Sequence, residues 1–221
     1  MTWLRYVNLS KTVLRLVVLL LTLVLSSTSF SEEWFRVRWV DDGDTIVLSS
    51  GEKVRYLGIN APEIPHEDQA GEIFGWEARN FNKRLVYHKK IRLEFDQVRR
   101  DRYMRLLAYV FLKDGTFVNA EMIRQGYAYV LYVRPNTKFF KFFLKLQQSA
   151  IKRRVGLWSK IKDQKYLFIG NRRSRRFHSR TCPFGNKIGP RNRILFKSLF
   201  DAFRNGYTPC KRCNPWQYDI R

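Results

Sequence analysis

The chain has 221 residues, of which 45% are hydrophobic, so it is long enough for one full domain and one small one, and a disordered chain is excluded. Its 42 Lys and Arg residues against 19 Asp and Glu residues leave a formal net charge of +23. That charge argues against a small neutral substrate and indicates an acidic partner, either nucleic acid or an anionic membrane surface.

The first 30 residues predict a secretory signal peptide. Basic residues precede an apolar run at residues 16–25, and small residues follow, with a cleavage point near Ser29 or Ser31. The run is shorter than the roughly 20 apolar residues of a membrane-spanning helix. We therefore expect export to the periplasm or the medium and no stable membrane association after cleavage. An uncleaved anchor formed by residues 13–25 is the alternative.

Residues 34–60 contain three short β-rich runs, WFRVRWV, DTIVLSS and EKVRYLGI, separated by the turn signals DDGD and SSGE. This pattern predicts antiparallel strands. GWEARNFNKRLVYH has helical spacing, and KIRLEFDQ and RLLAYVFL return to strand chemistry. The segment VNAEMIRQG ends on a glycine stop, and residues 139–155 predict a longer basic amphipathic helix. Five strands with interleaved helices predict an α+β fold built on a small closed barrel.

The composition changes after Trp158. The polar stretch SKIKDQK has no periodicity and predicts a linker at residues 160–165. Residues 161–221 hold 15 Lys and Arg against 3 Asp and Glu, about half of the excess charge, and all three cysteines of the chain. We therefore expect a catalytic or binding domain at residues 34–159 and a small second domain at residues 166–217.

Several charged residues lie at the ends of the predicted strands. They are Asp44 in DDGDT, Arg55 and Glu63 in VRYLGINAPE, and Arg105 in DRYMRLLAYV. Each alone has a structural explanation, because Asp-Gly is a common turn pair, a Glu after Pro caps helices, and an Arg on a strand is usually exposed to solvent.

Taken together, these residue types match the needs of phosphodiester cleavage. Two arginines can neutralise the charge that builds on the phosphoryl oxygens, because a guanidinium donates two hydrogen bonds and never deprotonates. A carboxylate free of metal can orient the attacking water or take its proton. Asp44 and the Asn60 side chain offer oxygens to a hard cation such as Ca²⁺.

The blocks DGDT, RYLGINAPE and DRYMRLLAYV, in this order and spacing, resemble the staphylococcal nuclease family over about residues 35–158. The resemblance implies a five-stranded OB-type barrel with about three helices, and Ca²⁺-dependent hydrolysis of DNA and RNA. It also implies three catalytic roles: Arg55 and Arg105 grip the phosphate, and Glu63 manages the water.

The same resemblance implies a calcium site and a nucleotide pocket. Asp44 would bind calcium through its carboxylate and Ala61 through its backbone carbonyl, and Tyr103 and Tyr132 match positions that line the nucleotide pocket. Asn60 departs from the family, which usually has a second calcium carboxylate there. A neutral amide oxygen of nearly the same shape removes one negative charge, so we expect weaker calcium binding with the geometry retained.

The tail contains a pattern of metal ligands. His178 and Cys182 are separated by three residues, and Cys210 and Cys213 by two. Three thiolates and an imidazole make a closed tetrahedral set of the kind that holds structural zinc. The alternative, a disulfide between Cys210 and Cys213 in an oxidising compartment, leaves Cys182 alone.

The tail also resembles the zinc-binding domain of Ada-type DNA-repair proteins over about residues 166–215, notably in GYTPCKRCNP. That family has four cysteines, and the first accepts a methyl group. His178 stands at that position here, so methyl transfer is not assigned. What the resemblance implies is a basic module that zinc stabilises and that suits the DNA backbone.

The sequence thus predicts an exported, monomeric, Ca²⁺-dependent nuclease acting on DNA, RNA or both, with a zinc module that aids nucleic-acid binding. A non-catalytic nucleic-acid-binding protein with the same basic surfaces is the alternative. A cationic membrane-surface protein is a third interpretation. The spread of basic charge over two folded domains, with no exposed amphipathic helix that we can single out, argues against it.

Overall fold

The structure is a computed structural model that describes Val13 and residues 32–65, 67 and 70–216. The predicted signal peptide at residues 1–30 and the alternative anchor at residues 13–25 lie outside the described residues, apart from Val13. Every strand of the described chain lies within residues 33–216. Within the described part of the chain, no helix has the length and apolarity needed to cross a membrane.

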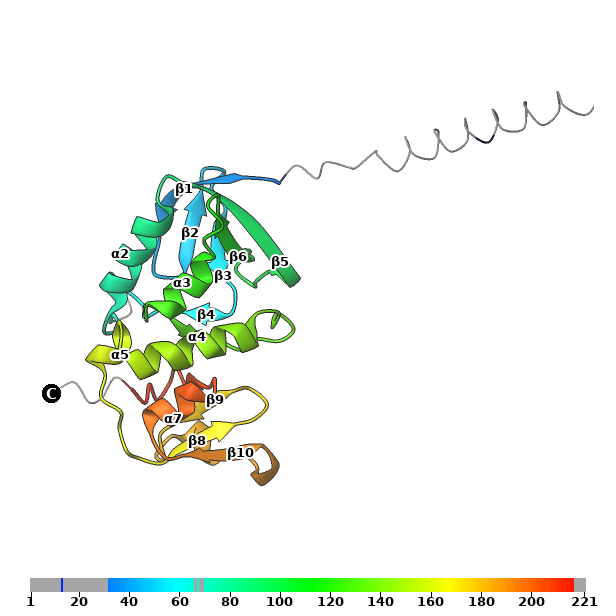
Figure 1. Ribbon diagram of the computed structural model, residues 1–221. Coiled ribbons are helices and arrows are strands. Elements are labelled where there is room, and N and C mark those ends of the chain that lie inside the picture. The colour runs from blue at the N-terminus through cyan, green and yellow to red at the C-terminus, as the bar shows by residue number, and fades with distance from the viewer. Residues whose placement is uncertain (1–12, 14–31, 66, 68–69, 217–221) are drawn as a thin grey trace, which may run out of the picture. The chain divides into compact units, whose positions relative to one another are not determined.

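Five strands close into a barrel in the order β1-β2-β3-β6-β5 (Figure 1). Strands β3 and β6 pair in parallel, and the other neighbours are antiparallel. The predicted α+β class with a five-stranded barrel is therefore confirmed. The barrel strands are β1 (Phe35–Val40), β2 (Thr45–Leu48), β3 (Lys53–Tyr56), β5 (Lys90–Arg100) and β6 (Leu106–Leu112).

Strand β3 shows how alternating side chains build the barrel. Val54 and Tyr56 are buried in the barrel core, and Arg55 between them is directed to the other face, as strand alternation requires. Directly after β3, a two-stranded sheet pairs β4 (Ile59–Asn60) with β7 (Tyr129–Val130). Through this pairing Ile59 and Asn60 of the RYLGINAPE block lie against a segment about 70 residues later in the chain.

Two helices lie between these strands, and two follow β7. They are α2 (Gly75–Val86), α3 (Val118–Arg124), α4 (Phe140–Arg153) and the short α5 (Leu157–Lys160). The predicted glycine stop after α3 is Gly126, whose φ of 73° is in the left-handed region that glycine adopts without strain. Helix α4 matches the predicted basic amphipathic helix. Its Phe143 packs in the barrel core, and its Ala150 and Ile151 pack in a second core.

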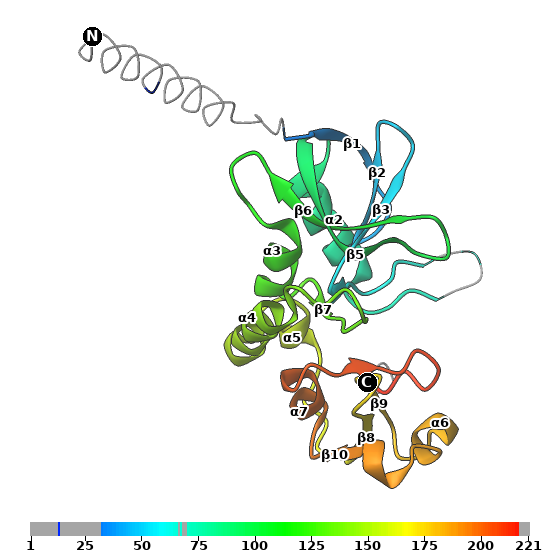
Figure 2. The same cartoon turned by 90° about the vertical axis from the view of Figure 1, so that its right-hand side faces the viewer.

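The tail forms a four-stranded sheet in the order β10-β8-β9-β11 with short helices around it (Figure 2). Strands β9 and β11 pair in parallel. Helix α7 has an N-cap, because the Ser198 side chain accepts a hydrogen bond from the Asp201 amide. The elements are β8 (Phe168–Asn171), β9 (Arg176–His178), α6 (Pro183–Asn186), the 3₁₀-helix η1 (Pro190–Asn192), β10 (Arg193–Phe196), α7 (Leu199–Arg204) and β11 (Thr208–Pro209).

The second core is shared between the barrel and the tail. Trp158, at 0% exposed, packs edge-on against Phe200 and Phe203 of α7. The Gln147 side chain of α4 donates to the Phe203 carbonyl and accepts from the Val130 amide. The barrel and the tail are therefore joined by buried apolar and polar contacts on both sides of the predicted linker.

Candidate active site and metal centre

Asp44 lies in the turn between β1 and β2, and its carboxylate is buried, with the residue 4% exposed. Its Oδ2 accepts a hydrogen bond from the Ala61 amide at 2.7 Å and forms an ion pair with Arg55 at 2.8 Å. Burial raises the pKa of Asp44 well above its ordinary value, Arg55 opposes this, and the nearby charges of Asp42 and Glu63 add to it. Burial thus disfavours the ionised form of Asp44, and a neighbouring cation favours it.

Arg55 is held by four acceptors. Its Nη1 donates to the carbonyls of Tyr56 at 2.7 Å and Ile59 at 2.9 Å. Its Nη2 reaches Asp44 at 2.8 Å and Asn60 Oδ1 at 3.0 Å. Because these acceptors come from the turn, from β3 and from β4, the guanidinium is fixed in orientation before any substrate arrives.

Asn60 is buried, at 5% exposed, and uses both ends of its amide. Its Oδ1 accepts from Arg55, and its Nδ2 donates to the Ala61 carbonyl at 3.0 Å and to the Tyr129 hydroxyl at 2.9 Å. A carboxylate cannot donate either of the last two bonds. The structure thereby shows a reason for an amide at position 60.

Tyr129 is a site residue that the sequence reasoning missed. It is the register partner of Asn60 in the β4–β7 pair and is 3% exposed. Burial raises the pKa of Tyr129 well above its ordinary value, so the hydroxyl is neutral at neutral pH. Its only sequence signal is one aromatic residue in a short strand, which indicates core packing.

Glu63 lies in the segment that follows β4, and its side chain is 25% exposed. Its Oε1 lies 3.4 Å from Lys211 Nζ of the tail. Its backbone amide donates to the Glu72 carboxylate at 3.1 Å, and its carbonyl accepts from the Glu72 amide at 2.8 Å. Burial raises the pKa of the Glu72 carboxyl. The predicted water-managing carboxylate is thus anchored through its backbone and keeps its side chain accessible.

Arg105 immediately precedes β6. Because Arg55 pairs with Leu107 in the parallel β3–β6 pair, strand alternation places Arg105 on the same face of the barrel as Arg55. The Arg105 guanidinium forms an ion pair with Asp101 at 2.8 Å and lies 5.6 Å from the centre of the Tyr103 ring. The structure therefore brings Arg105 and the exposed Tyr103 together beside the Arg55 face.

Tyr132 is placed differently. Its hydroxyl accepts from Arg134 at 2.8 Å, its ring packs edge-on against Phe140, and the Arg175 guanidinium of the tail lies 5.2 Å from the ring centre. Among the described residues, no contact joins Tyr132 to Asp44, Arg55 or Glu63. Its predicted role in the nucleotide pocket stays a prediction.

The predicted calcium donors suit a hard cation. Asp44 Oδ1 accepts only from the Thr45 hydroxyl, at 3.2 Å, and the carbonyl oxygens of Asn60 and Ala61 each accept one hydrogen bond among the described residues. Each oxygen thus keeps a lone pair that is not used. One carboxylate with two neutral carbonyl oxygens is a set that Ca²⁺ accepts, with fewer acidic groups than a high-affinity site has.

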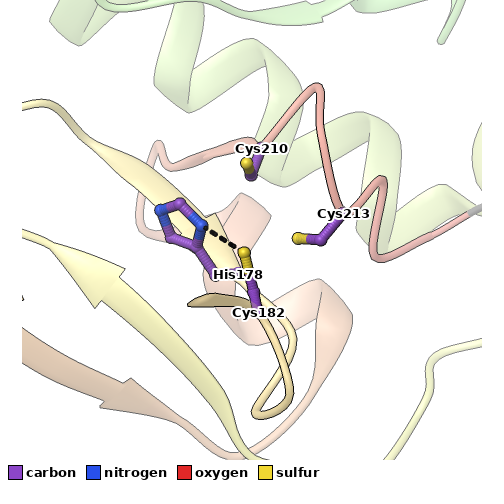
Figure 3. Close-up of side chains that lie close together, drawn as sticks. All are labelled: His178, Cys182, Cys210 and Cys213. Carbon is purple, nitrogen blue, oxygen red and sulfur yellow. Dashed lines mark hydrogen bonds between the residues drawn. The ribbon is translucent and has the colours of Figure 1, made fainter. Parts of the chain in front are cut away.

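The tail ligands converge on a second position. The donor atoms of His178, Cys182, Cys210 and Cys213 lie within 4.8 Å of one another, and His178 Nδ1 is 3.3 Å from Cys182 Sγ (Figure 3). Tetrahedral zinc at about 2.3 Å from each sulfur would hold sulfurs about 3.8 Å apart, so the group fits the ion. All three cysteines are free thiols. Burial, aided by Arg176, lowers the pKa of His178, which favours the neutral imidazole that binds metal.

Residues 53–160 match the family model described as staphylococcal nuclease homologue. The thermonuclease of Staphylococcus intermedius is 33% identical over 138 residues, which cover 61% of this chain and 82% of that protein. The chain belongs to the staphylococcal nuclease family. The predicted hydrolase of the nuclease class is thereby confirmed.

Two endonucleases of Bacillus subtilis match over a similar span. Endonuclease YncB of Bacillus subtilis is 43% identical over 124 residues, 54% of this chain and 58% of that protein. The SPbeta prophage-derived endonuclease YokF of the same organism is 42% identical over 124 residues, 54% of this chain and 42% of that protein. The match to the family model ends at residue 160, so the four candidate metal ligands of the tail lie outside it.

Proposed function

We propose that this member of the family is an exported nuclease that hydrolyses phosphodiester bonds of DNA, RNA or both with the help of Ca²⁺. The observation that carries the proposal is the arrangement around Arg55, whose guanidinium is fixed between Asp44 and Asn60 on the same barrel face as Arg105. Two oriented guanidinium groups on one face form a site for a phosphate group.

Each residue then has a chemical task. Arg55 and Arg105 donate hydrogen bonds to the phosphoryl oxygens and stabilise the charge that develops on them. Glu63, whose side chain is partly accessible, orients a water molecule for attack and takes its proton. A calcium ion held by Asp44, Asn60 and Ala61 would supply further positive charge beside the scissile phosphate.

We further propose that His178, Cys182, Cys210 and Cys213 bind structural zinc and that the tail adds affinity for nucleic acid. The Ada-type resemblance and the convergence of the four donor atoms support this. The tail also carries exposed arginines: Arg172, Arg173, Arg180, Arg191 and Arg212. Because these charges are tethered to the barrel, phosphate contacts by the tail raise the effective concentration of substrate at the catalytic face.

A non-catalytic nucleic-acid-binding function is the second candidate, and one observation favours it. Arg55 forms an ion pair with the carboxylate that is proposed to bind calcium, and Asn60 supplies no second carboxylate. In that case the arginines would act as a phosphate clamp without cleavage.

The deciding experiment is cleavage of circular single-stranded and double-stranded DNA by the full exported protein over a Ca²⁺ titration. A calcium-selective chelator serves as the blank. Circles require an internal cut, so their nicking identifies an endonuclease. We expect Arg55→Ala and the isosteric Glu63→Gln to lose at least about a hundredfold in rate, as the removal of an oriented charge-stabilising group does. Arg84→Ala, an exposed arginine of α2, is the matched control. DNA binding without cleavage at every calcium concentration would establish the binder instead.

Export is tested by the N-terminus of the secreted protein. We expect a mature chain that begins near residue 30, in the cell-free fraction. An intact N-terminus in the membrane fraction would favour the anchor at residues 13–25.

A further inference from the structure

The tail segment that carries two of the metal ligands also contacts the nuclease site. We call residues 210–216 the metal knuckle, because Cys210 and Cys213 lie in it. Between these two cysteines, Lys211 directs its ammonium group to within 3.4 Å of Glu63 Oε1. Among the described residues, this lysine is the cationic side chain that forms an ion pair with the predicted catalytic carboxylate.

The second contact runs through the core to the calcium donors. Trp216, at 2% exposed, packs edge-on against the Tyr129 ring with the ring centres 5.7 Å apart. Tyr129 in turn accepts the hydrogen bond from Asn60, whose amide also bonds the Ala61 carbonyl and Arg55. The last residue of the knuckle thus supports the residue that orients the calcium and phosphate groups.

A third contact of the knuckle holds Glu72, which is hydrogen-bonded to the backbone of Glu63. The Asn214 side chain hydrogen-bonds Glu72, and Glu72 is bonded twice to the backbone of Glu63. The knuckle therefore contacts the Glu63 carboxylate directly and Glu72, which anchors the Glu63 backbone. Through Tyr129 it also supports Asn60, one of the proposed calcium donors.

The knuckle has few backbone hydrogen bonds of its own. Within the described chain, its backbone hydrogen bonds run from the Cys210 amide to the Phe177 carbonyl and from the Asn214 amide to the Cys210 carbonyl. An irregular segment with so few hydrogen bonds depends on the bonds from its cysteines to a metal for a fixed conformation. A thiophilic ion such as Zn²⁺ would supply them through three thiolates and an imidazole.

We infer that the ion bound by His178 and the three cysteines positions the nuclease site, because the knuckle that it orders holds Glu63 through Lys211 and Asn60 through Trp216 and Tyr129. This inference rests on the proposed function. The tail is then more than an affinity module: its metal content sets the activity of the barrel. Lys211 and Tyr129 are positioning residues that act through Glu63 and Asn60.

The test compares the full exported protein loaded with zinc and depleted of zinc, with calcium held constant. Two variants of the zinc-loaded protein break single links: Lys211→Met removes the ammonium group, and Tyr129→Phe removes only the hydroxyl. Lys197→Met, an exposed lysine of the tail, and Tyr207→Phe, a buried tyrosine of the tail, are the matched controls. Hydrogen exchange of peptides covering residues 59–75 and steady-state cleavage are both measured.

We expect zinc removal to raise amide exchange at Asn60, Glu63 and Glu72 by about tenfold or more, since these residues lose the contacts with the knuckle. We expect Lys211→Met to lower kcat by about two- to fivefold, the range of one exposed ion pair, with KM for DNA unchanged. Lys197→Met should leave kcat as it was. Tyr129→Phe should raise exchange around Asn60, and Tyr207→Phe should not.

Two results would overturn the inference. One is equal exchange at Asn60, Glu63 and Glu72 with and without zinc. The other is a kcat for Lys211→Met that matches Lys197→Met. If no sample cleaves DNA but exchange at these three residues still depends on zinc, the proposed nuclease function fails and the positioning by the knuckle stands.

Discussion

Asn60 shows how one residue connects two kinds of chemistry. Its oxygen faces Arg55, and its amino group bonds the Ala61 carbonyl and the Tyr129 hydroxyl. An aspartate there would add a charge to the calcium donors but would lose both donated hydrogen bonds. The Ala61 carbonyl would then be left facing a carboxylate in a buried position. Calcium affinity and stability without calcium are therefore in opposition at this residue.

For this reason we expect Asn60→Asp to lower the calcium concentration for half-maximal cleavage severalfold, because affinity for Ca²⁺ follows ligand charge. Without calcium, the same variant should lose about 1–3 kcal/mol of unfolding free energy, the usual cost of an unpaired buried polar group. Calcium titrations of cleavage and urea unfolding in chelator measure the two effects. Asn80→Asp, which adds the same charge to an exposed position of α2, is the control. An unchanged calcium midpoint would remove Asn60 from the metal site.

At the scale of elements, the turn between β5 and β6 orients the second arginine. The Asp101 carboxylate accepts hydrogen bonds from the Tyr103 amide, the Arg105 amide and the Arg105 Nε at 2.8–3.0 Å. Burial raises the pKa of Asp101, but the hydrogen bonds and charge of Arg105 outweigh it, so the pKa lies below its ordinary value. The ionised form of Asp101 is therefore favoured by the fold.

A carboxyl whose pKa is lower in the folded protein stabilises the fold above its unfolded pKa of about 3.9, and this stability is lost as the pH falls through the lower folded value. Asp101→Asn should cost roughly 1–2 kcal/mol at pH 7 and should remove this part of the acid dependence. Urea unfolding from pH 7 to pH 3 measures both effects. Parallel curves for the two proteins over that range would show that Asp101 is not coupled to folding. Cleavage should also fall, since Arg105 loses its orienting partner.

The first residue of helix α2, Gly75, lies in close contact with the backbone of Glu63. A Cβ atom on Gly75 would lie 2.3 Å from the Glu63 carbonyl oxygen and 2.8 Å from its carbon. Because these are backbone atoms, they cannot move aside without displacing Glu63. The lack of a side chain at Gly75 therefore lets helix α2 approach the backbone of Glu63.

We expect Gly75→Ala to lower stability by about 1–3 kcal/mol, as overpacking does, and to reduce cleavage more than tenfold through the displacement of Glu63. Gly189→Ala is the control, because a Cβ atom there meets open space. Thermal unfolding and kcat are the measurements. Full activity of Gly75→Ala would show that the Glu63 position tolerates the shift.

At the scale of the whole molecule, the barrel and the tail share a core. Tyr129 of β7 and Trp158 of α5 are covered by Phe203 and other apolar residues of the tail. Trp158 and Trp216 each have an indole N–H that is buried with no hydrogen-bond partner among the described residues. Apolar packing therefore dominates this junction.

A chain that ends after Asp163 should consequently be much less stable than the full protein. Each large side chain that becomes exposed forfeits about 1.5–3 kcal/mol of burial, and Trp158, Ile151 and Tyr129 are all uncovered. We expect a loss of about 5 kcal/mol or more, seen as an earlier urea midpoint and aggregation on concentration. A truncated chain with the same urea midpoint as the full protein would show that the barrel folds independently of the tail.

The sequence by itself determined the five-stranded barrel, its helices, the three nuclease blocks and the four tail ligands. These features follow from local patterns. The alternation in VRY predicts a strand, the glycine after α3 predicts a helix end, and the spacing of CKRC predicts a pair of ligands on one short loop. Only the tertiary structure decided that Tyr129 bonds Asn60, 69 residues away, and that Lys211 reaches Glu63, 148 residues away. No periodicity reports such pairs, because they depend on how β4 meets β7 and how the tail packs on the barrel.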